Sequence, residues 1–383
     1  MATENNNKNL NVPNLRFPEF SGEWVKTKLG DIGTTLIGLT YSPKDVVSSG
    51  GTIVLRSSNI KGGLTDYNDI VRVNKKIKES IITRVDDLLI CARNGSARLI
   101  GKNAILKQED CGHTFGAFMM VYRAQNNKFV HQLLNTKRYY AQVGENLGAR
   151  INQITTTDLN SFEFYFPQTL NEQNKIASML SLLDDRIATQ IKIIEDLKKL
   201  KSAIRAKVFK QLESSCEFWS EIGNMLQYEQ PSKYLVTSTE YSDSYATPVL
   251  TANKAFILGY TDEEFGIYSK GECVIFDDFT MDVKYVNFPF KVKSSAIKIL
   301  TSNSGNDLYF VYEYLQNLGL VSEEHKRHYI SEIEPMIVAC PTFEEQQNIS
   351  NLLRSFDSKI ECANRELTLY NKQKQYLLSQ MFI

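Results

Sequence analysis

Several patterns that mark enzymes and membrane proteins are missing from this chain of 383 residues. It has no G-x-G triplet, so a glycine loop for a dinucleotide or for adenosylmethionine is not indicated. It has no Pro-Pro pair, which excludes the acidic-Pro-Pro-aromatic motif of amino-methyltransferases. No apolar run approaches the ~20 residues of a membrane span, and the N-terminal MATENNNKNLN lacks the apolar stretch of a signal peptide. We therefore expect no membrane contact.

Cysteine and net charge are equally uninformative about a dedicated site. The six cysteines are scattered and form no CxxC pair, so neither a zinc ribbon nor a thioredoxin-type centre is indicated. Their spread in a long chain favours reduced thiols and a cytoplasmic location. Lys plus Arg equal Asp plus Glu at 44 each, so any binding to nucleic acid must come from local patches.

What is present is an internal repeat. Residues 169–209 match residues 342–382 at a constant offset of 173 positions (342 − 169), without a gap. Both segments place apolar residues in alternating steps of four and three, which is typical of a coiled coil because such a seam keeps facing one partner. Both seams are interrupted at matching positions, Gln190/Ala363 and Lys201/Lys374. We predict two long helices that bury each other's seams as an antiparallel pair.

Each of these helices is expected to begin with a capping box, Thr169 to Glu172 and Thr342 to Glu345. Shorter matches keep the same order in the rest of the chain, for example AFMMV (117–121) with AIKIL (296–300). We therefore predict an α/β (α+β) fold with two similar globular domains, each with a small mixed sheet, and a pseudo-two-fold internal repeat. The predicted segments are a disordered tail (1–14), a first domain (15–167), a first long helix (168–212), a second domain (213–340) and a second long helix (341–383).

The two predicted domains differ in the sign of their local charge. Residues 52–107 hold eleven Lys/Arg and five Asp/Glu, and Asn59, Asn94 and Ser96 lie among them. A basic patch with such polar side chains has the donors needed for phosphates and base edges, although a solvated basic surface would look the same. Residues 240–290 hold nine acidic residues and three lysines, which argues against a simple phosphate-binding face there.

Two kinds of metal site are conceivable. Asp277, Asp278 and Asp282 follow a strand-like run and could hold Mg²⁺ for phosphodiester cleavage, but the matching CARNGSAR of the first domain has no carboxylate. His325 and His328 have a spacing that a helix could use for a metal pair, but further ligands are not evident. A Mg²⁺-dependent nuclease therefore stays open as an alternative, as does a coiled-coil scaffold without DNA contact.

Two related domains on a rigid spacer suit a split DNA site, because B-DNA presents equivalent faces every ~34 Å. In its layout and motifs, the chain resembles the specificity subunit of bacterial Type I restriction-modification systems over about residues 15–383. The resemblance is carried by WVKTKLGDIG, DDLLICARNGSARLIGK, GARINQITTTDLNSFEFYFP and the repeated Pro…Glu-Gln…Ile opening of the long helices. In the second half VIFDDFTMD and EEHKRHYISEI depart from the matching segments of the first.

The resemblance implies that each domain reads one half of an asymmetric bipartite double-stranded site and that the helices act as a ruler. It also implies that the helices dock two methylation subunits, which use S-adenosylmethionine, and that two restriction subunits add chemistry driven by ATP and Mg²⁺. The chain itself would then be non-catalytic and without a cofactor.

Arginine bidentate to guanine and asparagine bidentate to adenine are the contacts expected of such a reader. In the first domain the candidates are Arg56, Asn59, Arg93, Asn94, Arg98, Lys102 and Arg150. In the second domain the candidates are Thr251, Asn253, Lys254, Thr280, Lys284, Lys326 and Arg327. For each of them a structural or solvated role is at least as well supported by composition. We assign Tyr41 and Phe115 to packing.

Overall fold

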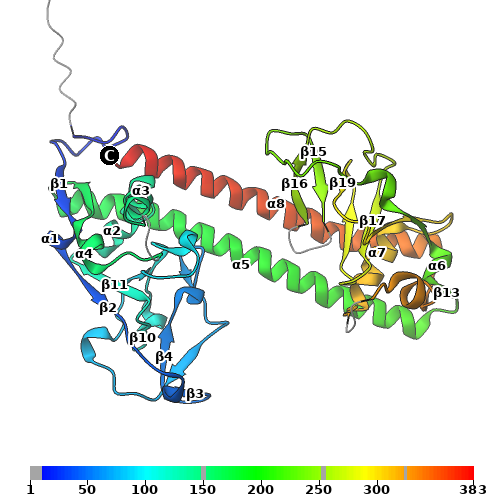
Figure 1. Cartoon of the computed structure of the whole chain (residues 1–383), viewed down its shortest axis with the longest axis horizontal. Helices are drawn as coiled ribbons and strands as arrows, with labels where there is room; N and C mark the ends of the chain where they lie inside the picture. The colour runs from blue at the N-terminus through cyan, green and yellow to red at the C-terminus, as the bar shows by residue number, and fades with distance from the viewer. Residues whose placement is uncertain (1–10, 148–151, 252–255, 323–325) are drawn as a thin grey trace, which may run out of the picture. The chain divides into compact units, whose positions relative to one another are not determined.

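The computed structural model describes residues 11–147, 152–251, 256–322 and 326–383. The chain divides into two compact units, which we call unit 1 (Met1–Lys192 with Arg365–Ile383) and unit 2 (Ile193–Asn364). Each unit contains one half of each long helix (Figure 1). Within the described ranges, no helix combines the length and the apolar character that crossing a bilayer requires.

The core of unit 1 is a four-stranded antiparallel sheet. In spatial order its strands are β2 (Gly33–Ile37), β11 (Met119–Ala124), β8 (Leu88–Cys91) and β9 (Asn103–Ile105). Successive residues of β8 face opposite sides, so that Leu88 and Ile90 join the larger apolar cluster of the unit while Leu89 and Cys91 join a smaller one. Both faces are therefore covered, which explains why β8 and β11 read as continuous apolar runs.

A second, smaller sheet covers one of these faces. Its strands in spatial order are β10 (Thr114–Phe115), β4 (Thr52–Leu55), β7 (Val71–Val73) and β3 (Val46–Val47), and β10 runs parallel to β4. The remaining strands and helices of unit 1 are β1 (Val25–Lys28), β5 (Ile60–Lys61), β6 (Leu64–Thr65), β12 (Glu163–Phe166), α1 (Leu29–Ile32), α2 (Asn127–Leu133), α3 (Lys137–Asn146) and α4 (Thr156–Ser161).

Unit 2 repeats this arrangement. Its main antiparallel sheet has the order β14 (Leu226–Glu229), β20 (Ile297–Ser302), β17 (Cys273–Asp277), β18 (Val283–Val286). Its smaller sheet has the order β16 (Ile257–Thr261), β15 (Thr247–Leu250), β19 (Lys291–Val292), again with one parallel pair. The other strands and short α-helices are β13 (Trp219–Glu221), α6 (Ile222–Met225), α7 (Leu308–Asn317) and β21 (Ile337–Ala339). The sequence repeat is thus a repeat of the fold, and the predicted mixed fold class is confirmed.

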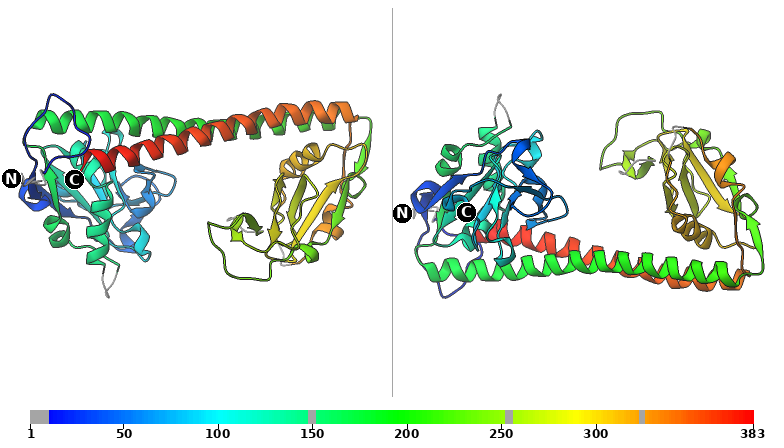
Figure 2. Two further views of the ribbon diagram at one scale, coloured as in Figure 1. Left: turned by 90° about the horizontal axis from the view of Figure 1, so that it is seen from above. Right: turned by 90° about the horizontal axis from the view of Figure 1, so that it is seen from below.

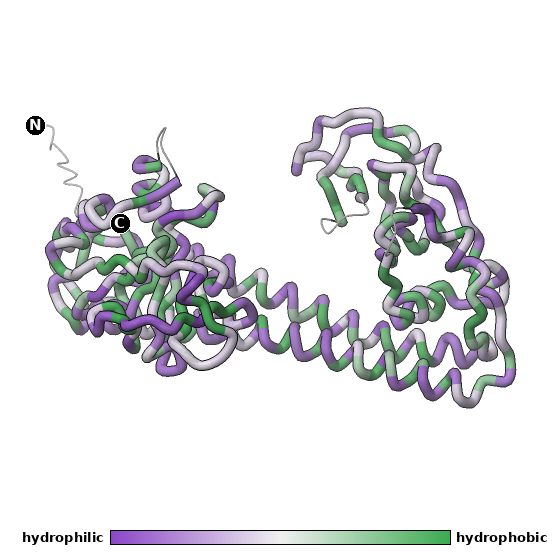
Figure 3. The backbone as a smooth tube through the Cα atoms, turned by 60° about the horizontal axis from the view of Figure 1, so that its bottom comes forward, coloured by the Kyte–Doolittle hydropathy of each residue, from purple (hydrophilic) through white to green (hydrophobic). Residues whose placement is uncertain are grey.

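The two long helices are α5 (Leu170–Ser215) and α8 (Phe343–Met381), where the sequence predicted helices over 168–212 and 341–383. Within each unit the halves of α5 and α8 lie side by side in both views of Figure 2. Hydrophobic and hydrophilic residues alternate along both helices (Figure 3), as the heptad pattern requires.

Polar pairs show that the helices are antiparallel and explain the interruptions of the seams. In unit 1, Lys374 Nζ lies 2.5 Å from Asp184 Oδ1, and Gln190 Nε2 donates to Glu366 over 3.0 Å. In unit 2, Lys201 Nζ lies 2.6 Å from Asp357 Oδ1. Lys201/Lys374 and Asp184/Asp357 are both related by the offset of 173, so the two ion pairs are copies of one another with the helices exchanged.

A phenylalanine near the C-terminal end of each long helix enters the core of a unit. Phe209 of α5 is fully buried in unit 2, where its ring centroid lies 5.5 Å from that of Phe310 and 4.6 Å from that of Tyr314. Phe382, the corresponding residue after α8, lies in unit 1 with its ring centroid 5.5 Å from that of Phe129. Each unit therefore depends on the helix that ends in it for part of its core.

The two helix starts differ in their caps. At α8 the predicted capping box is confirmed, because Glu345 N donates to Thr342 Oγ1 and Thr342 N donates to the Glu345 carboxylate. At α5 the prediction is wrong in one half. Thr169 Oγ1 accepts from Glu172 N, but the Glu172 carboxylate instead receives two hydrogen bonds from the Arg16 guanidinium, at 2.7 and 2.8 Å. This contact ties the N-terminal segment to the start of α5.

Lowering the pH is expected to destabilise unit 2 through Glu263. Burial raises the pKa of this carboxyl, but hydrogen bonds from buried Lys291, from Thr237 and from the Ser238 N–H prevail and lower it to about 2. A group whose pKa is depressed on folding contributes stability above its ordinary pKa, near 4.5, and loses that contribution as the pH falls toward 2. Urea unfolding followed by circular dichroism at pH 2 to 6 measures this loss.

The variant Glu263→Gln should be less stable than the parent at pH 6 and should depend less on pH between 5 and 2. Its exposed neighbour supplies the matched control, Glu264→Gln, which should follow the parent. Equal pH dependence in Glu263→Gln and the parent would contradict this role of the Glu263–Lys291 pair.

Candidate nucleic-acid interface

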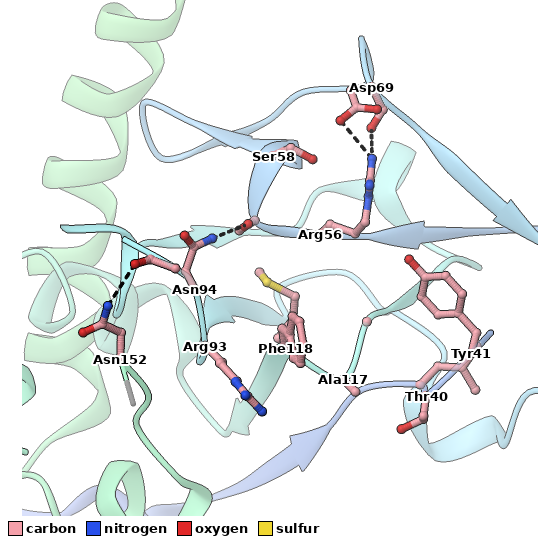
Figure 4. A pocket seen from close by; sticks show the side chains of 15 residues that line it. Thr40, Tyr41, Arg56, Ser58, Asp69, Arg93, Asn94, Ala117, Phe118 and Asn152 are labelled. Atoms are coloured by element: carbon pink, nitrogen blue, oxygen red, sulfur yellow. Dashed lines mark hydrogen bonds and ion pairs between the residues drawn. The ribbon is translucent and has the colours of Figure 1, made fainter. Parts of the chain in front are cut away.

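A pocket of about 990 Å³ opens on unit 1 where several loops of the two sheets meet (Figure 4). Its walls are the ends of β2 and β4, the loop after β8 and the short connection between β10 and β11. The residues that line it are Leu39, Thr40, Tyr41, Arg56, Ser57, Ser58, Asp69, Arg93, Asn94, Gly95, Gly116, Ala117, Phe118, Met119 and Asn152. Three of the predicted contact residues, Arg56, Arg93 and Asn94, are therefore brought together.

Arg56 follows β4 and is held at the rim of the pocket. Its guanidinium Nη2 lies 2.9 Å from the Asp69 carboxylate and donates to the Asp69 carbonyl over 3.2 Å. The side chain is half-buried, so part of the guanidinium stays accessible. This ion pair fixes where the positive charge of Arg56 lies in the pocket.

Asn59 does not face the pocket. It is fully buried, its Oδ1 accepts from Arg56 N, and its Nδ2 donates to the carbonyls of Asp66 and Asp69 at 2.9 and 2.8 Å. All of its strong hydrogen-bonding groups are thus engaged within the loop that carries Arg56. This corrects the prediction for Asn59: the side chain shapes the pocket from behind, and we remove it from the proposed base contacts.

Arg93 and Asn94 follow β8 and reach the pocket from its other side. The N–H groups of Ala92 and Arg93 both donate to the Phe118 carbonyl, at 2.9 and 3.0 Å, which fixes the start of this loop. The Arg93 side chain is exposed, and its guanidinium carbon lies 5.1 Å from the centroid of the Phe118 ring. Asn94 Nδ2 donates to Ser57 Oγ over 2.9 Å, which joins the two sides of the pocket.

The remaining candidates of unit 1 lie beside the pocket or outside the described residues. Lys102 is half-buried next to the Ser57 carbonyl, 3.5 Å from its Nζ, and burial lowers its pKa. Arg98 is exposed on the short 3₁₀ turn Ala97–Leu99 that follows Asn94. Arg150 lies outside the described residues. Lys102 therefore adds positive charge behind the pocket rather than inside it.

Three residues of the pocket were missed by the sequence reasoning. Tyr41, which we assigned to packing, lines the pocket and is half-buried, whereas Phe115 is fully buried as predicted. Asn152 donates from Nδ2 to the Gly95 carbonyl over 3.0 Å. Phe118 is 58% exposed although its neighbours on both sides are buried or half-buried. No signal in the sequence marked Phe118, because a strand covered on both faces can bury consecutive apolar residues, as β11 does at Met119 and Met120.

The candidates of unit 2 lie on separate segments. Thr251 follows β15, and its N–H donates to the Phe256 carbonyl. Thr280 is exposed in the turn after β17, and Lys284 is half-buried on β18. Lys326 pairs with Glu332 over 2.9 Å, and Arg327 approaches the Asp278 carboxylate to 4.0 Å. Asn253 and Lys254 lie outside the described residues.

Two carboxylates of the acidic cluster of unit 2, Asp277 and Asp278, have structural roles, whereas Asp282 is exposed. Asp277 Oδ1 accepts the N–H groups of Phe279 and Thr280, at 2.7 and 2.8 Å. Buried Asp278 accepts the N–H groups of His328 and Tyr329 and lies 3.4 Å from Lys298 Nζ. These carboxylates are engaged with backbone and with a cation, which argues against the Mg²⁺ alternative. No group of His, Cys, Asp or Glu within the described part of the chain is arranged to hold a metal ion.

Of the histidine pair, the structure describes His328 alone. His328 is buried, with Nε2 3.0 Å from Ser322 Oγ and Nδ1 2.9 Å from the Glu332 carboxylate. His325 lies outside the described residues. Both ring nitrogens of His328 are therefore occupied by neighbours on the protein.

The two units repeat one fold in tandem, and each contains one half of each long helix, which defines a class of proteins with a duplicated domain. The family model described as the Type I restriction modification DNA specificity domain matches residues 21–199 and again residues 219–369. The chain therefore belongs to the Type I restriction-modification specificity-subunit family. Specificity subunits are non-catalytic components of these systems, which agrees with the non-catalytic role predicted from the sequence.

Individual relatives support this assignment. The EcoR124I/EcoR124II specificity subunit of Escherichia coli is 42% identical over 176 residues, which are 43% of this chain and only 44% of that subunit. A putative MjaX specificity subunit of Methanocaldococcus jannaschii is 25% identical over 97% of this chain and 96% of its own length. The crystal structure of a Type I S subunit from M. genitalium shares the fold, with a TM-score of 0.63, 17% identity, and coverage of 97% of this chain and 99% of that one.

Proposed function

We propose that this chain reads an asymmetric, bipartite double-stranded DNA sequence, with one half-site bound by each unit. The observation that carries this proposal is the pocket of unit 1, which gathers Arg56, Arg93 and Asn94 from two different loops. Family membership supports the proposal, because the matched domain is described as a DNA specificity domain.

The residues of the pocket divide into two kinds of contact. Arg93 is exposed, and it forms no ion pair with any described residue. Its guanidinium N–H groups are therefore available to donate to the O6 and N7 acceptors of guanine. Asn94 and Asn152 suit adenine, which offers one donor and one acceptor to a side-chain amide. Arg56, held by Asp69, suits a phosphate and would set the position of the unit on the duplex.

Unit 2 is proposed to read a different sequence. Matching AFMMV with AIKIL makes Met119 equivalent to Lys298. In the main sheet of each unit, Met119 lies opposite Cys91 and Lys298 lies opposite Phe276, so Cys91 is equivalent to Phe276. Two residues further along, Asp278 therefore takes the place of Arg93. Asp278 is buried, whereas Arg93 is exposed, so the two units present different chemistry at corresponding points. Non-identical half-sites follow from this difference.

The long helices are proposed to dock two methylation subunits and two restriction subunits. Apolar side chains that face away from the helix pair support a docking role, for example Leu182, Leu369 and Tyr376, which are exposed on α5 and α8. S-adenosylmethionine would be bound by the methylation subunits, and ATP and Mg²⁺ by the restriction subunits. A cytoplasmic location follows from the proposed partners.

Methylation-site sequencing tests this proposal. DNA exposed to the chain together with its methylation subunit should carry methyl groups within one asymmetric bipartite sequence. Exchanging residues 213–335 for the equivalent part of a relative should then change one half of that sequence and leave the other half intact. A change in both halves would argue against one half-site per unit, and methylation without any sequence preference would reject a reading role.

A further inference from the structure

The pocket of unit 1 contains an apolar side chain that its polar surroundings do not explain. Phe118 is 58% exposed, and Figure 4 shows its ring in the middle of the site with Arg93 beside it. Phe118 and Arg93 also line a second cavity of about 340 Å³, together with Gln153, Thr155 and Thr156. The Phe118 ring therefore stands as a ridge between two hollows of one surface.

The backbone that carries Phe118 is rigid. Gly116 N donates to the Leu55 carbonyl and Ala117 N donates to the Leu39 carbonyl, both at 2.9 Å, so the loop is held by the end of β4 and by the segment that follows β2. On the opposite side the Phe118 carbonyl accepts the N–H groups of Ala92 and Arg93. A side chain at Gly38 would place its Cβ 2.2 Å from the Gly116 carbonyl oxygen, so the two backbones are in close contact. The loop cannot withdraw the Phe118 ring from the surface without breaking these contacts.

The Phe118 ring also orients Arg93. A guanidinium that lies against an aromatic face is attracted by the ring quadrupole, and it keeps its N–H groups free in their own plane. The carbon-to-centroid distance of 5.1 Å lies within the range of this interaction. Arg93 and Phe118 thus present a donor fork and an apolar edge side by side.

We propose that Phe118 recognises the C5-methyl group of a thymine next to the base that Arg93 contacts. This inference rests on the proposed function and specifies the chemistry of one position in the half-site read by unit 1. The major groove offers donors, acceptors and one kind of apolar group, the thymine methyl, so an exposed phenyl ring among polar readers has one complementary target there. The matching residue of unit 2, Ile297, is fully buried, so the contact belongs to one half-site.

A deoxyuridine scan tests this inference, because replacing thymine with deoxyuridine removes the methyl group and nothing else. The probe is a labelled duplex that carries the sequence found by methylation-site sequencing, and it is titrated with the complex of the full chain and its methylation subunits. One thymine in the half-site of unit 1 should respond, with binding weakened about four-fold, the effect of one methyl group removed from water. Thymines in the other half-site should respond less.

The variant Phe118→Ala should bind the thymine and deoxyuridine duplexes equally at that position. Phe218→Ala is the matched control, since Phe218 is 67% exposed in unit 2 and should leave the response intact. A half-site without a thymine on either strand, a flat scan of the parent, or a response that persists in Phe118→Ala would each overturn the inference. Failure of the parent complex to prefer any sequence would instead reject the proposed function.

Discussion

Replacing Arg93 with alanine is expected to weaken binding of the target duplex by roughly 5- to 150-fold and to relax base choice at one position. The reason is that a bidentate arginine–guanine contact contributes about 1–3 kcal/mol of discrimination. Within the described residues, the Arg93 guanidinium lies against the Phe118 ring and makes no ion pair. Removing it therefore leaves no buried acidic group without its partner. Fluorescence anisotropy with matched and singly mismatched duplexes measures both effects.

The matched control is Arg84→Ala. Arg84 belongs to the same basic stretch and is exposed, but it lies outside the pocket that contains Arg93. Its replacement removes the same formal charge and should lower affinity for all duplexes to a similar, small extent. Equal affinity of Arg93→Ala and the parent for matched and mismatched duplexes would reject the reading role of Arg93.

Replacing Phe209 with alanine is expected to destabilise unit 2 by about 3–5 kcal/mol, the usual cost of removing a buried phenyl ring from a packed core. Phe209 is fully buried and packs against Phe310 and Tyr314, yet it belongs to α5 rather than to the globular part of the unit. The loss should therefore loosen the end of α5 and the core together. Urea unfolding gives the free energy, and hydrogen exchange read by mass spectrometry localises it.

Peptides from Ile193–Asn364 should lose protection, whereas peptides that contain β8 or β11 should keep it. The control is Phe343→Ala at the start of α8, where the side chain is 46% exposed and contributes less to packing. Protection lost uniformly across both units would show that Phe209 does not act within unit 2 alone. A loss below about 1 kcal/mol would place Phe209 outside the core, since such values are typical of surface positions.

The features of the fold that the sequence predicted well are those that repeat along the chain. The heptad seams predict two long helices that bury each other's seams. The reason for the matched interruptions at Lys201 and Lys374 came only from the structure, where each lysine pairs with an acid of the other helix. Asp357 and Asp184 supply those acids. Periodicity is read from the sequence of one element, which is why these predictions succeed.

Features that depend on contacts between distant segments could not be predicted. Glu172 has the spacing of a capping residue, but Arg16, 156 positions away, competes for its carboxylate. Asn59 stands in a basic stretch like a base-reading residue, but its burial against Asp66 and Asp69 is set by the fold of a loop. The grouping of Arg56 with Arg93 and Phe118 likewise arises from three loops that only the sheets bring together.

The placement of Phe382 has a consequence for the order in which the molecule matures on the ribosome. Unit 2 is made from the continuous stretch Ile193–Asn364, whereas unit 1 also needs Leu378, Met381 and Phe382 for its core. The part translated first must therefore wait, with some of its apolar surface uncovered, until the part translated later has emerged. Vectorial synthesis thus favours completion of unit 2 before unit 1.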